Sequence, residues 1–276
     1  MTESRILPAA SGLRVPVAEP TGTARCTIYA LHGGGLNGDY WDCPTDTDLS
    51  LVRLATSLGY RVAHPDRPGH RAGDARWPGG LSTEAEAAVH TETIRELWPD
   101  EPVVLLGQSA GAMVALHIAA SASDGSLPQL LGIDYSGVGI TLDVSRIVDG
   151  LTLESFWGPK SLYPPATFTP EGRVTAPTTE HDGTAANSWS QAFHSVAARV
   201  QIPVRVTMVD HEAWWGEVSS TLIDVAAGFT SAVSVQTNIE YAAGHNVSVG
   251  LSARSYHLGV LAFVEQCLRR AQLTQH

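Results

Sequence analysis

Ser109 is the residue whose surroundings in the sequence best suit a catalytic nucleophile. It stands at the centre of a Gly-x-Ser-x-Gly motif at residues 107–111, between the apolar run 103–106 and the Ala-, Met- and Leu-rich run 112–120. These runs predict a buried strand before the serine and a helix after it. A chain that reverses from strand to helix within such a turn strains the serine backbone and exposes its hydroxyl. We therefore predict a nucleophile at Ser109; the alternative is an ordinary glycine-rich turn.

A run of glycines near the start of the chain could bind a negatively charged reaction intermediate. Three glycines follow His32, directly after the predicted strand 26–31. Without side chains, they leave their backbone N–H groups open to a ligand. Because the run lies after a strand and upstream of the serine turn, it is interpreted as half of an oxyanion hole, formed by Gly34 and Gly35 with the N–H of Ala110 as the other half. The alternative is a flexible loop.

Three motifs together give the chain a family resemblance. The strand that ends in His-Gly-Gly-Gly at 32–35, the serine turn at 107–111 and the string Asp-Arg-Pro-Gly-His at 66–70 together resemble the α/β-hydrolase superfamily. The resemblance covers roughly residues 24–140 and 200–272. It implies an α/β fold with a mainly parallel, twisted sheet flanked by helices. The motifs are specific for the superfamily and do not name a substrate, and the 66–70 loop is interpreted as a structural turn near the site.

The resemblance also implies a general base and an acid that orients it. His245 follows the last predicted strand and completes the order serine, acid, histidine, so it is predicted to be the general base. The acid is expected just beyond the strand 203–209, which favours Glu212, although aspartate is usual there and the longer glutamate needs a slightly more distant loop. Asp210 is the runner-up, and Asp134, on an earlier strand, is a third candidate.

These parts predict acyl transfer at a serine. His245 would take the proton of Ser109 as it attacks an acyl carbonyl, Glu212 would fix the histidine tautomer, and water would release the acid. The sequence shows no phosphate-cradling glycine loop and no spacing typical of metal ligands, so neither a cofactor nor a metal is expected. A small-molecule substrate is the expected partner.

Three functions from different classes remain open. The first is a serine hydrolase acting on an ester, lactone or thioester of a largely apolar small molecule. The second, by family analogy alone, is a lyase of bacterial secondary metabolism, for example one that eliminates acetate from an acetylated polyketide. The third is a non-catalytic ligand-binding member. Such members normally lose part of the triad, and because all three parts are present here, this function ranks last.

Alternating strands and helices are expected to position these residues in a mainly parallel sheet. Beyond the strands named above, the sequence predicts strands at 60–65, 130–136 and 233–241, and an edge strand or hairpin within 1–20. Helices are predicted at 49–58, 83–97, 221–229 and 256–272. Ser82 or Thr83, with Glu86, is predicted to form a capping box that starts the second helix.

Residues 141–200 break this alternation. The segment has many prolines, few strand signals and scattered large aromatic residues. We predict an inserted helical lid at 141–200 over the carboxyl edge of a core made of 1–140 and 201–276, or else a satellite cluster that packs on itself. The residues predicted to contact the substrate are Trp41, Gln108, Phe156, Trp157 and Trp214.

Composition excludes several other functions. A net charge of -11 argues against nucleic acid as a partner, because phosphates would be repelled. The sequence shows no signal peptide and no run close to the roughly 18 apolar residues of a membrane helix, so a cytoplasmic protein is expected. The three cysteines are interpreted as structural thiols. The oligomeric state is left open, with a homodimer as one option.

Overall fold

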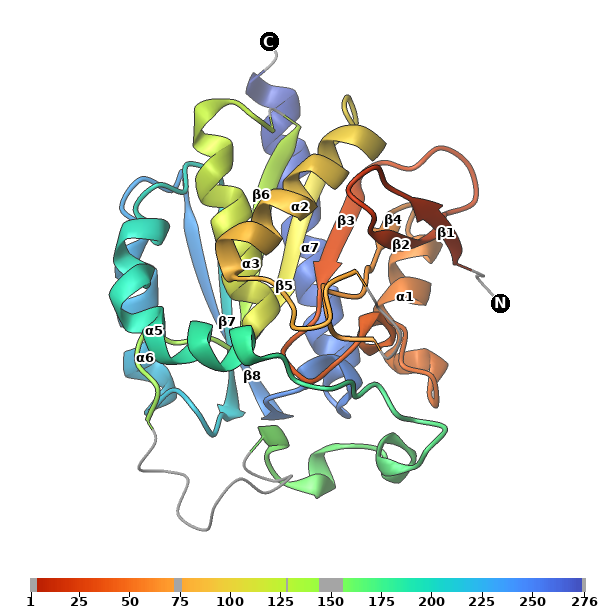
Figure 1. Cartoon of the computed structure of the whole chain (residues 1–276), viewed down its shortest axis with the longest axis vertical. Helices are drawn as coiled ribbons and strands as arrows, with labels where there is room; N and C mark the ends of the chain where they lie inside the picture. Colours follow the sequence, from red (N-terminus) through yellow and green to blue (C-terminus); the bar gives the residue numbers. More distant parts are fainter. Residues whose placement is uncertain (1–3, 72–75, 128, 144–155, 275–276) are drawn as a thin grey trace.

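The fold is built on one twisted sheet with helices on both faces (Figure 1). The computed structural model describes residues 4–71, 76–127, 129–143 and 156–274. Within these residues the strands form an eight-stranded sheet in the order β1-β2-β4-β3-β5-β6-β7-β8. The strands are β1 (Arg5–Pro8), β2 (Arg14–Ala18), β3 (Thr27–Leu31), β4 (Arg61–Ala63), β5 (Val103–Gln108), β6 (Leu130–Ser136), β7 (Val204–His211) and β8 (Val235–Gly244).

Strands β3 to β8 pair in parallel, and β1 and β2 form an antiparallel hairpin at one edge. Every residue of β3 and β5 is buried. Continuous apolar burial is typical of parallel strands that are covered by helices on both faces. The α/β class and the mainly parallel sheet predicted from the sequence are therefore confirmed.

The helices form two layers. One layer contains α2 (Thr83–Leu97), α3 (Ala110–Ser121), α5 (Glu180–Ala197) and α6 (Val218–Gly228), whose apolar side chains pack in one buried cluster. The other contains α1 (Leu51–Ser57) and α7 (Ala253–Thr274) in a second cluster. No helix among the described residues is both long and apolar enough to cross a membrane.

The start of α2 differs from the prediction. Ser82 is the N-cap and accepts a hydrogen bond from the Ala85 N–H at 3.3 Å, but Glu86 does not complete a capping box. With Ser82 as N-cap, Glu86 lies one position beyond the residue that could reach back to it. The Glu86 side chain is instead buried and paired with Arg67.

Helix α5 comes from the second half of the segment predicted as a lid. Its Trp189 and Phe193 are buried, and the Phe193 ring meets the Phe229 ring edge-on at 5.9 Å. Gly228 of α6 makes room for this contact, because a Cβ there would lie 2.4 Å from the Phe193 ring. From residue 180 onward, the segment is thus part of the helix layer on the sheet.

The earlier part of the same segment lies elsewhere. Residues 156–175 run beyond the carboxyl ends of β7 and β8 (Figure 1). Trp157, Tyr163 and Phe168 form an aromatic cluster there, with ring centroids 5.2 to 5.7 Å apart. Residues 144–155 of the predicted insertion lie outside the described part of the chain.

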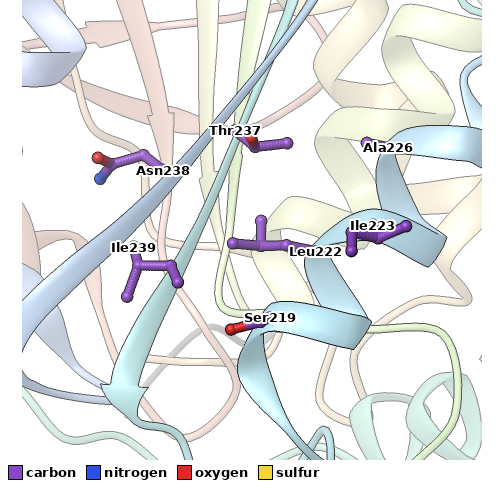
Figure 2. A pocket seen from close by; sticks show the side chains of 7 residues that line it. All are labelled: Ser219, Leu222, Ile223, Ala226, Thr237, Asn238 and Ile239. Atoms are coloured by element: carbon purple, nitrogen blue, oxygen red, sulfur yellow. The ribbon is translucent and has the colours of Figure 1, made fainter.

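A shallow hollow lies between α6 and β8, at the free edge of the sheet (Figure 2). Leu222 of α6 lies on the side of the helix that faces Thr237 and Ile239 of β8. The hollow includes none of the residues predicted to do chemistry, so it is separate from the site described below.

We expect Phe193→Ala to lower the free energy of unfolding by about 3–5 kcal/mol, because the ring is fully buried between two helices. Ile223→Ala on α6 is the matched control: this side chain is 69% exposed, so its loss should change stability by about 0.5 kcal/mol or less. Urea unfolding followed by circular dichroism measures both. Equal losses would contradict the place of α5 in the core layer.

Candidate active site

Ser109 lies at the turn between β5 and α3 in a strained conformation. Its φ of 53° and ψ of −128° are rarely adopted by a residue with a side chain. The flanking glycines are needed because the turn is tightly packed. A Cβ on Gly107 would lie 2.5 Å from the Ala112 Cα, and one on Gly111 would lie 2.3 Å from the His32 carbonyl oxygen. The turn is thus pressed against the end of β3.

The glycine run after β3 passes directly beside the serine. A Cβ on Gly33 would lie 3.0 Å from the Ser109 Cβ. His32 Nε2 accepts the Arg67 N–H at 2.9 Å, so Nδ1 carries the proton and donates to the Gly33 carbonyl at 2.8 Å. The N–H of a trans peptide points opposite to its carbonyl, so this bond turns the Gly34 N–H away from His32.

His32 is held neutral as well as in place. Burial lowers the pKa of His32 well below its usual value, and the neighbouring His70 ring and Arg67 guanidinium lower it further. A neutral ring can keep one nitrogen as an acceptor, as its bond to Arg67 requires. The orientation of the glycine run thus depends on a single histidine tautomer.

Residues 174–182 pack against the glycine run and hydrogen-bond to its backbone. The Ala176 N–H donates to the Gly35 carbonyl at 2.8 Å, and the Asn37 N–H donates to the Val174 carbonyl at 2.9 Å. Asp182, in the first turn of α5, lies against the same run, since a Cβ on Gly34 would be 3.2 Å from its Oδ2. Sequence reasoning did not find this support, because it joins residues about 140 positions apart.

His245 and Glu212 form a buried pair at the carboxyl edge of the sheet. His245 Nδ1 lies 2.9 Å from Glu212 Oε2 and 3.1 Å from Oε1. Oε1 also accepts the backbone N–H groups of Ala213 at 2.9 Å and Trp214 at 3.1 Å. Because the carboxylate can only accept, His245 Nδ1 must donate, which leaves Nε2 as a proton acceptor. The His245 N–H donates to the Trp157 carbonyl at 3.0 Å.

The other two candidate acids have different partners. Asp210 accepts the N–H groups of Ala242 at 2.9 Å and Ala243 at 3.0 Å, where β8 contains a residue at φ 53°. Asp134 is fully buried and lies 2.5 Å from the guanidinium of Arg205. Burial raises the pKa of Asp134, an effect that Arg205 opposes. Among the described side chains, Glu212 is the carboxylate in hydrogen-bond contact with His245 Nδ1.

Gln108 connects the serine turn to the histidine loop. Its side-chain amide is buried and donates to the His245 carbonyl at 2.9 Å. Gly137, after β6, fits against both residues, because a Cβ there would lie 3.4 Å from the Gln108 amide nitrogen and 3.4 Å from His245 Cε1. This bond holds the backbone of the histidine loop, and the contact of Gln108 with substrate stays a prediction. Nothing in the sequence pattern singled out Gly137.

The aromatic residues predicted to contact substrate fall into two groups. Trp41 is fully buried and packs edge-on against Tyr40 at 4.8 Å, and Trp157 belongs to the aromatic cluster around Tyr163. Phe156, in contrast, is 41% exposed, and its ring lies 5.1 Å from that of Trp214, two residues after Glu212. The Phe156 and Trp214 rings thus contact each other close in the chain to Glu212.

Buried charges surround Arg67, in the loop that the sequence suggested was structural. Arg67 Nε and Nη2 lie 2.6 and 3.0 Å from the carboxylate of Glu86, and Nη2 lies 2.9 Å from Asp182. His70 Nε2 lies 2.7 Å from the other oxygen of Asp182. Burial alone would raise the pKa of Asp182, but Arg67 and His70 outweigh it and hold this pKa well below its usual range. No cluster suited to a metal ion occurs among the described residues.

Solved structures with the same fold include several hydrolases. The chain is similar to a carboxyl esterase from Bacillus coagulans, with a TM-score of 0.73 and 17% identity over 96% of this chain and 98% of the esterase. An N-acyl homoserine lactonase complexed with N-hexanoyl homoserine lactone gives 0.67 and 17%, over 96% and 98%. A monoglyceride lipase variant from Saccharomyces cerevisiae gives 0.67 and 14%, over 98% and 96%. At these identities the likeness shows the fold.

Comparison with characterised sequences gives a shorter match. Protein phosphatase methylesterase 1 of Pongo abelii is 28% identical over 120 residues, which is 43% of this chain and 29% of the methylesterase. The match spans less than a third of that relative. The model of the alpha/beta hydrolase family, in contrast, matches residues 28–248, which contain the serine turn, the glycine run and the histidine–glutamate pair. The chain therefore belongs to the alpha/beta hydrolase family, as its motifs predicted.

Proposed function

We propose that the protein is a serine hydrolase that cleaves an ester, lactone or thioester of a largely apolar small molecule through an acyl-enzyme. The observation that carries the proposal is the buried contact of 2.9 Å between His245 Nδ1 and Glu212, on the sheet edge where the strained Ser109 turn lies. The fold is shared with an esterase, a lactonase and a lipase, which supports this reaction class.

In the proposed mechanism, Ser109 Oγ attacks the acyl carbonyl while His245 Nε2 takes its proton. Glu212 holds Nδ1 as a donor and stabilises the imidazolium that forms. The negative charge on the carbonyl oxygen would be bound by the N–H groups of Gly34, Gly35 and Ala110. The imidazolium then protonates the leaving group, and water, deprotonated by the same histidine, releases the acid and restores the serine.

We assign the apolar part of the substrate to the aromatic pair Phe156 and Trp214. Two observations support this assignment: Phe156 is partly exposed, and the Trp214 backbone N–H donates a hydrogen bond to Glu212 Oε1. Trp41 and Trp157 would act as packing residues, and Gln108 would hold the His245 backbone. We also propose that the part of the insertion that covers the site ends before α5, at about residue 179, because α5 packs in the core layer.

Product analysis in heavy-oxygen water distinguishes hydrolysis from the lyase alternative. A hydrolase incorporates one labelled oxygen into the released acid, because water attacks the acyl-enzyme. An elimination releases the acid with the oxygens it already had. Short p-nitrophenyl esters and N-acyl homoserine lactones are suitable first substrates, since both carry an apolar acyl chain. Label-free acid from an accepted substrate would contradict the proposal.

Ser109→Ala and His245→Ala should each lower turnover by about 3 to 6 orders of magnitude, because triad members act as one unit. Ser195→Ala, on an exposed position of α5, is the control and should retain full turnover. A fluorophosphonate probe should label wild-type protein at Ser109 alone, since the probe reacts with an activated serine. Labelling of a different serine, or near-normal rates in either triad variant, would rule out this site.

Glu212→Gln should lower turnover by at least about a hundredfold through the wrong histidine tautomer. The Gln oxygen must remain where Oε1 accepts the Ala213 and Trp214 N–H groups, so its amide nitrogen faces His245 Nδ1. That nitrogen donates, which forces the proton of the imidazole onto Nε2.

Asp210→Asn is the matched comparison and should lose about tenfold or less, because its carboxylate serves two backbone N–H groups of β8. Steady-state kinetics with one ester measures both variants. The reverse ranking would reassign the acid to Asp210, and two mild effects would leave neither of the pair as the acid.

A further inference from the structure

The buried charges around Arg67 are joined to the glycine run that the proposed function uses as an oxyanion hole. Asp182 lies against Gly34, where an added Cβ would be 3.2 Å from its Oδ2. The carboxylate is thus fixed beside the place where negative charge develops during acyl transfer. An uncompensated negative charge on Asp182 would oppose the build-up of negative charge on the acyl oxygen.

Two basic side chains contact the Asp182 carboxylate, one on each oxygen. Arg67 Nη2 lies 2.9 Å from Oδ1, and His70 Nε2 lies 2.7 Å from Oδ2. The other nitrogen of His70, Nδ1, lies 3.1 Å from the Pro68 carbonyl oxygen. Both ring nitrogens therefore face acceptors, and only an imidazolium donates from both. The carboxylate does not supply the second proton, because the Arg67 guanidinium holds the pKa of Asp182 below its usual range despite burial.

With His70 as an imidazolium, Arg67 and His70 would balance the carboxylates of Glu86 and Asp182. All four side chains are at least nine-tenths buried. Arg67 is already paired through two nitrogens with Glu86, so His70 supplies the charge that neutralises Asp182. His32, whose ring meets His70 edge-on at 5.1 Å, adds no charge because its pKa is lowered.

We propose that His70 is a positioning residue of the oxyanion hole, whose imidazolium neutralises Asp182 and keeps a net negative charge away from Gly34. This inference rests on the proposed function. It accounts for a carboxylate beside an anion-binding loop, an arrangement that would otherwise disfavour catalysis. Asp182 also fixes the start of α5 through a capping box with Thr179, so the same residue joins the helix layer to the glycine run.

The test is a pair of variants that change charge while keeping hydrogen bonds. His70→Gln removes the cation, leaves Asp182 ionised, and should lower kcat by about 10- to 100-fold with little change in KM. Asp182→Asn removes the anion. His70 then becomes neutral and accepts from the new amide, so kcat should stay within about threefold of wild type. The double variant is again balanced and should recover most of the activity lost in His70→Gln.

The double variant separates charge from packing. If His70 acts only by packing, the losses of the two changes add, and the double variant is worse than either one. Additive losses would overturn the proposal. A loss of more than about tenfold in Asp182→Asn alone would also overturn it, and this measurement remains available if His70→Gln does not fold. Arg71→Gln is the control for removing a cation from the same loop, because that side chain is 49% exposed, and it should leave kcat unchanged.

A readout without substrate keeps this inference separate from the proposed function. Nitrogen-15 NMR of labelled histidine at neutral pH should show His70 as an imidazolium in the wild type and as a neutral ring in Asp182→Asn. A neutral His70 in the wild type would overturn the charge assignment. If Ser109 is unlabelled by the fluorophosphonate while the NMR result holds, the hydrolase function fails and the charge assignment stands.

Discussion

The close approach of the serine turn to the end of β3 is the constraint on which the site depends. Gly111 lies so near the carbonyl groups of Leu31 and His32 that a Cβ would be 2.3 to 2.4 Å from their oxygens. This contact brings the two halves of the proposed oxyanion hole together, one at the N-terminus of α3 and the other after β3. The strained backbone of Ser109 persists because the surrounding packing leaves the turn no other path.

Hydrogen bonds to the backbone then align loops that come from distant parts of the chain. The Gln108 amide holds the His245 carbonyl, and the Trp157 carbonyl holds the His245 N–H. Asp210 performs a similar task for β8, where it satisfies two N–H groups beside a residue of positive φ. Each of these bonds fixes a main-chain atom, so together they place the backbone that carries the histidine ring.

Buried ionisable side chains are costly to place in a protein interior unless they are paired. Here Arg67 and His70 face Glu86 and Asp182 across hydrogen bonds of 2.6 to 3.0 Å. The set joins the loop after β4 to α2 and α5 beneath the glycine run. Substitution of one member would leave its partner buried and unpaired, which costs more than the pair itself contributes. Such a set favours one arrangement of the loop over others.

The sequence by itself determined the α/β class, the family, and the local features of the serine turn and the glycine run. These depend on patterns within a few residues, such as apolar runs, glycine spacing and helix caps. Only the tertiary structure decided which carboxylate meets His245, since Asp210 and Glu212 are two residues apart at the irregularly paired end of β7, where Asp210 bonds to β8 and Glu212 to the histidine. The same holds for Glu86, predicted as a cap and found paired with Arg67, and for the packing of α5 in the core layer. Contacts across 19 to 137 residues carry no local signal, because burial and long-range pairing arise only when the sheet has brought those segments together.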